Sequence, residues 1–228
     1  LSLAHHLPNS LRVLIVGAKP SAGSSVESTG LITSNTRAEF QSFFDIDASI
    51  TNPITCICVI APNFTDHFIS KTDEPWIYQT DTKGLVRRLA ETLPSNVELR
   101  VATAFVGIDG PKGVSTITLQ DSKGKKYEVT THFLVGADGG RSKVASLVPT
   151  LDRNRDFLFG YEQVLFGDVH LGPQPEETIY HFWFGEFSLG YGGWLSPTVV
   201  EGKKAFRIGL AKLMKDRGDA KRLMDKFL

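Results

Sequence analysis

The segment Phe133–Val144 constrains the fold of this chain more than any other. It consists of an apolar run, a glycine-rich Gly-Ala-Asp-Gly turn and an Arg-Ser-x-Val sequence that can open a helix. A short apolar run bounded by glycine predicts a buried strand, and the residues after the turn predict a helix over Arg141–Leu147. The simplest interpretation is a turn that caps a helix, with Asp138 accepting hydrogen bonds from backbone N–H groups.

A second glycine-rich segment lies near the start of the chain. The run Leu11–Val16 predicts a buried strand, and Gly17 follows it directly. A strand, a tight glycine turn and a helix start together hold a dinucleotide pyrophosphate, because glycine lets the backbone approach the phosphates. The G-x-G-x-x-G pattern is altered here, since Lys19 occupies the second position and Ala22 the third. A glycine-rich surface loop explains the same residues equally well.

The remaining patterns predict two kinds of structure. Leu85, Leu89 and Leu93 share one face of a helix over Thr82–Leu93, which ends at Pro94. From Phe157 onwards, aromatic-rich runs separated by turn residues predict an antiparallel sheet. Its expected strands are Phe157–Val169, Thr178–Phe187, Gly193–Leu195 and Lys204–Leu210, followed by a helix over Leu213–Leu228. The fold class is therefore α/β, with an antiparallel-sheet part.

Composition excludes several classes of function. The 228 residues include 25 Lys plus Arg and 25 Asp plus Glu, a balance that lacks the basic surface of a nucleic-acid-binding protein. No apolar run approaches the roughly 18 residues of a membrane span, and Leu1–Asn9 does not resemble a secretory signal. Cys56 and Cys58 are expected to be buried on one face of a strand, so we expect no metal site and no disulfide. The cytoplasm is the expected location.

Several segments, in order along the chain, carry a resemblance to a known family. Phe133–Val144 is similar to the second FAD fingerprint of flavoprotein monooxygenases and their relatives. Ser28–Thr33, Trp76–Leu89, Gly190–Pro197 and Phe206–Leu210 resemble segments of geranylgeranyl reductase-like flavoproteins within that superfamily. Three positions depart from the family pattern: Ser28 replaces its cysteine, Thr82 an arginine and Ser196 an aromatic residue.

The resemblance implies an FAD-dependent oxidoreductase, with NAD(P)H as the electron donor. It implies flavin-mediated reduction of a carbon–carbon double bond in an isoprenoid or other apolar substrate. The cofactor-binding residues it implies are Gly17, Ala18, Pro20, Ala22, Gly136, Ala137, Asp138, Gly139, Arg141 and Ser142. The residues expected to line the substrate are Phe184, Tyr191, Trp194 and Pro197. No catalytic residue is assigned.

Two alternatives remain open from the sequence. One is a flavin-dependent monooxygenase of a planar substrate. The other is a non-catalytic remnant or fragment that no longer binds FAD and acts as a binding module. A small apolar or isoprenoid substrate is the expected partner, with peripheral membrane contact through a lipid substrate. A homodimer is expected from exposed strand edges, and no nucleic acid is expected.

The expected Rossmann-like FAD-binding half is incomplete. In the family, a helix and a second strand ending in an acidic residue follow the glycine loop, about 20 residues on. Here the glycine loop runs to Ser25 and the next family-like segment begins at Ser28, which leaves no room for that helix and strand. The chain is therefore interpreted as gapped or truncated. The FAD-binding part is expected over residues 1–30 and 83–149, and the substrate-domain part over 31–82 and 150–228.

Overall fold

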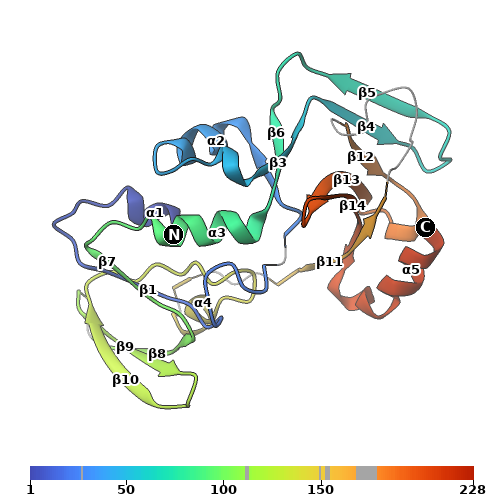
Figure 1. Ribbon diagram of the computed structural model, residues 1–228. Coiled ribbons are helices and arrows are strands. Elements are labelled where there is room, and N and C mark those ends of the chain that lie inside the picture. Colours follow the sequence, from blue (N-terminus) through green and yellow to red (C-terminus); the bar gives the residue numbers. More distant parts are fainter. Residues whose placement is uncertain (27, 111–112, 149, 152–154, 168–178) are drawn as a thin grey trace. The chain divides into compact units, whose positions relative to one another are not determined.

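The protein, described from a computed structural model, divides into two compact units. The structure describes residues 1–26, 28–110, 113–148, 150–151, 155–167 and 179–228. Unit 1 comprises Leu1–Val26 and Lys83–Arg155, and unit 2 comprises Glu27–Thr82 and Asp156–Leu228. The sequence predicts boundaries at 30/31, 82/83 and 149/150, whereas the two compact units divide at 26/27, 82/83 and 155/156. Figure 1 labels helices and strands of both units.

Unit 1 contains a short parallel sheet of two strands. Strand β1 (Val13–Val16) pairs in parallel with β7 (Val97–Arg100), and a short helix α1 (Ser2–His5) precedes β1. Helix α3 (Thr82–Glu91) leads into β7 and buries Leu85 and Leu89, as their spacing predicts. The strand predicted within Leu11–Val16 is confirmed as β1, and the helix predicted over Thr82–Leu93 is confirmed as α3.

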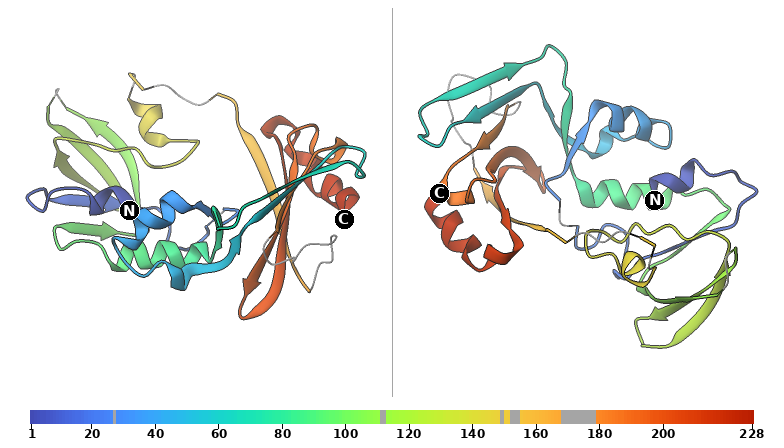
Figure 2. Two further views of the ribbon diagram at one scale, coloured as in Figure 1. Left: turned by 90° about the horizontal axis from the view of Figure 1, so that it is seen from above. Right: turned by 180° about the vertical axis from the view of Figure 1, so that it is seen from behind.

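A three-stranded antiparallel sheet forms the rest of unit 1, as Figure 2 shows in yellow-green. Its strands are β8 (Thr103–Asp109), β9 (Ser115–Asp121) and β10 (Lys126–Thr131), in the order β10-β9-β8. Asp121 closes the β9–β10 turn, because its Oδ1 accepts from the N–H groups of Lys123 and Lys125 at 2.9 Å each. Helix α4 (Lys143–Leu147) packs on β8.

The strand predicted over Phe133–Val135 is wrong. These residues have no regular secondary structure, and Phe133 and Val135 are 85% and 65% exposed. A strand needs a neighbour for its backbone hydrogen bonds. In the described part of unit 1, β1 pairs with β7 on one side only, and no strand flanks Phe133–Val135. The apolar sequence alone therefore does not make this segment a strand.

Unit 2 contains a small antiparallel sheet that supports one helix. Strand β6 (Ile77–Thr80) lies between β2 (Leu31–Thr33) and β3 (Ile50–Ile54). Helix α2 (Ser34–Gln41) follows β2 and is capped by the Thr33 side chain, which accepts from Thr36 N. Arg37 of α2 makes a two-bond contact of 2.8 and 2.7 Å with Asp47 in a one-turn 3₁₀ helix, η1 (Asp47–Ser49).

A six-stranded sheet is the main element of unit 2 and matches the predicted aromatic sheet (Figure 1). Its order is β11-β14-β13-β12-β4-β5. The strands are β4 (Cys56–Ile60), β5 (His67–Lys71), β11 (Leu158–Phe166), β12 (Ile179–Trp183), β13 (Gly193–Val200) and β14 (Lys203–Leu213). All pairs are antiparallel except β12 with β4, which is parallel. Val169 and Thr178, expected strand residues, lie outside the described residues.

Helix α5 (Ala220–Phe227) covers one face of this sheet and closes the core of unit 2 (Figure 2). The core contains Leu195, Ile208, Leu210 and Met224, and Phe227 stacks on Phe187 at 4.2 Å between ring centroids. The helix predicted from Leu213 begins later, because a 3₁₀ helix, η4 (Met214–Asp219), comes first. In the described part of the chain, no helix has the length and apolar character to cross a membrane.

Candidate functional site

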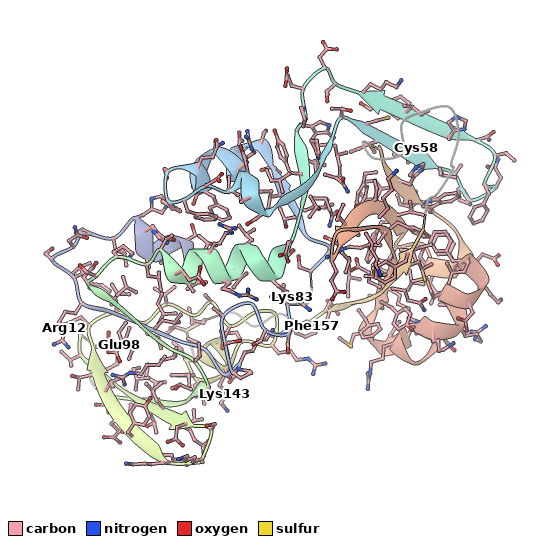
Figure 3. The ribbon with its side chains drawn as sticks, viewed as in Figure 1. Arg12, Cys58, Lys83, Glu98, Lys143 and Phe157 are labelled. Carbon is pink, nitrogen blue, oxygen red and sulfur yellow. The ribbon has the colours of Figure 1, made fainter. Side chains whose placement is uncertain are left out.

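The Gly-Ala-Asp-Gly turn of unit 1 is organised around one carboxylate. Asp138 accepts three hydrogen bonds: from the Ser142 hydroxyl at 2.5 Å, from Lys143 N at 2.6 Å and from Val144 N at 3.1 Å. Figure 3 labels Lys143 at the start of α4. Partial burial raises the pKa of Asp138, but these hydrogen bonds outweigh burial and lower it below the ordinary value. The carboxylate therefore caps the first turn of α4.

Two glycines give this turn its shape. Gly136 lies so close to α4 that a Cβ there would be 3.0 Å from the Val144 side chain. Gly139 has a φ of +82°, which favours glycine, and no atom of the described residues lies within 4 Å of the position of its Cβ. The turn thus packs on α4 at Gly136 and leaves open space at Gly139.

The loop after β1 also has an open glycine. Gly17 donates to Arg100 O at 2.9 Å and accepts from Thr103 N at 2.9 Å, which fixes it beside the β7–β8 corner. No described atom lies within 4 Å of where its Cβ would be. The Lys19 ammonium folds back to donate to the Ser25 carbonyl oxygen. Residues 18–25 form bends and turns, which agrees with the glycine-rich loop expected here, without the helix that the family places after its glycine turn.

The far side of this loop packs against α3. Gly23 has a φ of +78°, and a Cβ there would lie 3.2 Å from the backbone carbon of Lys83, which Figure 3 labels at the first turn of α3. Gly23 therefore serves loop packing.

In unit 2, an aromatic side chain lies across the face of the large sheet opposite α5. Trp194 of β13 donates from Nε1 to Glu162 Oε2 of β11 at 3.0 Å, although β14 lies between these strands. The indole crosses β14 above Gly209, where a Cβ would lie 2.8 Å from Nε1 and closer still to the ring carbons. Gly209 is thus required for the ring to lie where it does.

Side chains from both sheets of unit 2 hold the Ser28–Gly30 backbone. Arg207 Nη1 donates to Ser28 O at 2.9 Å, Gln79 Nε2 to Thr29 O at 2.7 Å, and the Thr80 hydroxyl to Gly30 O at 2.8 Å. Gln79 is itself oriented by the Ser196 hydroxyl of β13, which donates to its Oε1 at 2.5 Å. Three successive carbonyl oxygens are therefore bound by side chains of unit 2.

The four expected substrate-lining residues do not all lie together. Trp194 and Pro197 are three residues apart in β13, so their side chains project from opposite faces of the sheet. Phe184 follows β12, and Tyr191 lies in the turn before β13, after a 3₁₀ helix, η3 (Glu186–Ser188); both are exposed. Trp194 faces the Glu162 side of the sheet, and Pro197 faces the other side.

A family model described as the FAD binding domain matches residues 46–219, which is most of the chain. The chain belongs to this FAD binding domain family. The matched range includes the Gly-Ala-Asp-Gly turn and the strands that carry Glu162, Trp194 and Arg207. A comparison with curated protein sequences gave no match.

Solved structures support the same fold. A geranylgeranyl bacteriochlorophyll reductase-like protein from Thermoplasma acidophilum superposes with a TM-score of 0.78 at 15% identity, over 96% of this chain and 55% of that one. p-Nitrophenol 4-monooxygenase from Pseudomonas putida gives 0.68 at 14% identity, over 99% and 57%. A triple mutant of a flavin-dependent brominase gives 0.68 at 13% identity, over 90% and 57%. The chain spans just over half the length of each, and at these identities the likeness establishes the fold.

The glycine positions in unit 1 fit the FAD that this family binds. Gly17 and Gly139 both face open space that any larger side chain would fill. Gly17 and its loop neighbours Ala18, Pro20 and Ala22 would face the phosphates. Ala137, Gly139 and the Asp138-capped start of α4, with Arg141 and Ser142, would face the rest of the cofactor. Without a helix after Gly17, the loop lacks the helix dipole that adds to phosphate binding, so we expect weaker retention of FAD.

The sequence did not identify the residues that hold Trp194 and Ser28. Glu162, Arg207, Gln79 and Ser196 sit on four different strands and meet only through the register of the two sheets. One signal was present: Gly160 and Gly209 interrupt strand patterns, and glycine inside a strand marks the close approach of another group. Here that group is the Trp194 indole.

Proposed function

We propose that the chain works as an FAD-dependent oxidoreductase acting on an apolar substrate. The observation that carries this proposal is the Trp194 indole, which Glu162 holds over Gly209 on the face of the large sheet opposite α5, in a chain of the FAD binding domain family. When bound, the flavin supplies hydride chemistry, and the protein supplies orientation and exclusion of water. Trp194 would contact the substrate, and the Gly17 and Gly139 turns would hold the cofactor.

The finer proposal is reduction of a carbon–carbon double bond in an isoprenoid chain, with NAD(P)H as the electron donor. The similarity to the Thermoplasma acidophilum reductase-like protein supports it, as does the apolar character of the Trp194 face, where Val164 and Phe166 of β11 are exposed. A long chain would lie along such a strip. Hydroxylation of a planar substrate is the alternative, and the similarity to the Pseudomonas putida monooxygenase supports it.

Product analysis tests the reaction class. The chain is incubated with FAD, NADPH and geranylgeraniol, with and without oxygen, and the product is examined by mass spectrometry. Alkene reduction adds two hydrogen atoms and proceeds without oxygen. Hydroxylation adds one oxygen atom and requires oxygen. A product that forms only in air and carries an added oxygen atom would replace the reductase proposal with the monooxygenase one.

A second candidate is a binding module without FAD. The turns after Gly17, where the family places a helix, favour it. Absence of flavin uptake together with retained binding of an apolar ligand would establish this candidate. The partners proposed alongside the oxidoreductase are a membrane surface met through a lipid substrate and a second copy of the chain, with the cytoplasm as the location.

A further inference from the structure

The ion pair between Glu162 and Arg207 on the Trp194 face is largely buried. The side chains of Glu162 and Arg207 are 22% and 18% exposed, and Arg207 Nη1 donates to Glu162 Oε1 at 3.2 Å. The two residues lie on adjacent strands, β11 and β14. Fully exposed ion pairs hold their partners weakly, whereas a covered pair with further hydrogen bonds fixes its geometry. The charge of Glu162 also reaches Tyr180: burial raises the pKa of that phenol, and Glu162 raises it further.

Each member of the pair holds one other group. Glu162 uses its second oxygen, Oε2, to accept from the Trp194 indole N–H. Arg207 uses the same Nη1 to donate to Ser28 O at 2.9 Å. A continuous chain of hydrogen bonds therefore runs from the Ser28 backbone through Arg207 and Glu162 to the indole.

The indole is fixed at two places. Its N–H is bound by Glu162, and one ring face rests over Gly209. Trp194 is half-buried, so part of the side chain remains accessible to a ligand. A flat ring held in this way offers its face to planar sp² carbon, either a double bond of a chain or an aromatic ring.

We propose that Glu162 and Arg207 are positioning residues, which fix the Trp194 indole as a flat surface for the sp² carbons of the substrate. The substrate part of this inference rests on the proposed function. Arg207 links the indole, through Glu162, to the Ser28–Gly30 backbone. A displacement of either one is therefore expected to shift the other. Neither residue touches the reacting atoms.

The test measures binding without flavin. Calorimetry gives the Kd of the full chain for geraniol, a short isoprenoid alcohol, and for 2-naphthol, an aromatic one. We expect Glu162→Ala and Trp194→Phe, which remove the two ends of one hydrogen bond, to weaken binding about five- to tenfold, corresponding to about 1 kcal/mol. Glu162→Gln keeps a carbonyl acceptor and is expected to stay within twofold of the unchanged chain. Glu201→Gln, in the exposed β13–β14 turn, is the matched control.

Indole N–H resonances separate positioning from a general structural effect. The three tryptophans give three such signals, and Trp194→Phe identifies one of them. We expect Glu162→Ala, Arg207→Ala and either ligand to shift the Trp194 signal and leave those of Trp76 and Trp183 in place. Preferential binding of geraniol would assign an isoprenoid source and of 2-naphthol an aromatic one.

Two results would overturn the inference. One is a Kd for both ligands that Glu162→Ala leaves within twofold. The other is a shift of all three indole signals in Glu162→Ala that Glu162→Gln does not restore, because that pattern reports a loosened fold. Since no flavin is present, failure here is distinct from failure of the oxidoreductase proposal, which flavin uptake and product analysis decide.

Discussion

At the scale of single residues, the most constrained position is Gly209. Its backbone lies under the Trp194 indole, so the absence of a side chain there is a packing requirement. Gly209→Ala is expected to lower the free energy of unfolding by about 1–3 kcal/mol, because the methyl group must displace the ring. Urea denaturation measures this change.

A second substitution makes the Gly209 test specific. In a Trp194→Leu background the ring is gone, so adding Gly209→Ala is expected to cost less than 1 kcal/mol by the same reasoning. Equal costs of Gly209→Ala in both backgrounds would show that the methyl group meets something other than Trp194.

His181 makes the folded state sensitive to acid. The side chain is 2% exposed, its Nδ1 has no hydrogen-bond partner among the residues that the structure describes, and burial lowers the pKa of the imidazole from 6.5 to about 4. Between these values the unfolded chain binds a proton that the folded chain does not, so stability falls as pH falls from 6.5 towards 4. The full loss is roughly 3 kcal/mol, from 1.36 kcal/mol per pKa unit.

Unfolding at a series of pH values checks this expectation. His181→Met removes the titrating group and should flatten this part of the profile, while the exposed His67 replaced by Gln should leave it unchanged. A His181→Met profile as steep as that of the unchanged chain would assign the acid sensitivity to other groups.

At the scale of elements, local patterns and cross-strand contacts differ in what sequence reveals. The leucine spacing of α3 and the glycine turn before α4 are local, and the structure contains both elements. Phe133–Val135 has equally strand-like residues, but a strand also needs a paired neighbour, which local sequence does not reveal. The Trp194–Glu162 contact depends likewise on strand order, so Trp194 could be proposed and its partner could not.

The exposed Phe133 segment gives an element-scale prediction. Phe133→Ser with Val135→Thr is expected to change the free energy of unfolding by less than about 0.5 kcal/mol, since both side chains lie largely in solvent. Leu89→Ala in the buried face of α3 should cost about 2–5 kcal/mol. A loss above about 2 kcal/mol for the Phe133 variant would mean that this segment is packed as a strand.

The capping of α4 by Asp138 gives a second element-scale prediction. Asp138→Ala removes the acceptor of three hydrogen bonds and is expected to cost about 1–2 kcal/mol, with Asp138→Asn closer to the unchanged chain. Thermal unfolding compares the three proteins. An Asp138→Ala protein as stable as the unchanged chain would remove the carboxylate from its structural role and leave it free for a ligand.

At the scale of the whole molecule, the two units carry separate parts of the proposed function. Unit 1 holds Gly17 and Gly139, which we expect to face the cofactor, and unit 2 holds the Trp194 indole and the bound Ser28–Gly30 backbone. We expect part of the FAD to occupy the open space at Gly17. Gly17→Val should therefore leave thermal stability unchanged and weaken FAD binding at least tenfold. Gly218, in η4 and also facing open space, is the matched control for the same substitution.

Flavin uptake tests the central claim most directly. The purified chain is mixed with excess FAD, separated from free flavin, and examined by visible absorption. We expect the flavin bands to accompany the protein at up to one FAD per chain, with a loss in Gly17→Val and none in Gly218→Val. An unchanged chain that retains no flavin at any FAD concentration would contradict the account, and would leave unit 2 as a binding module without a cofactor.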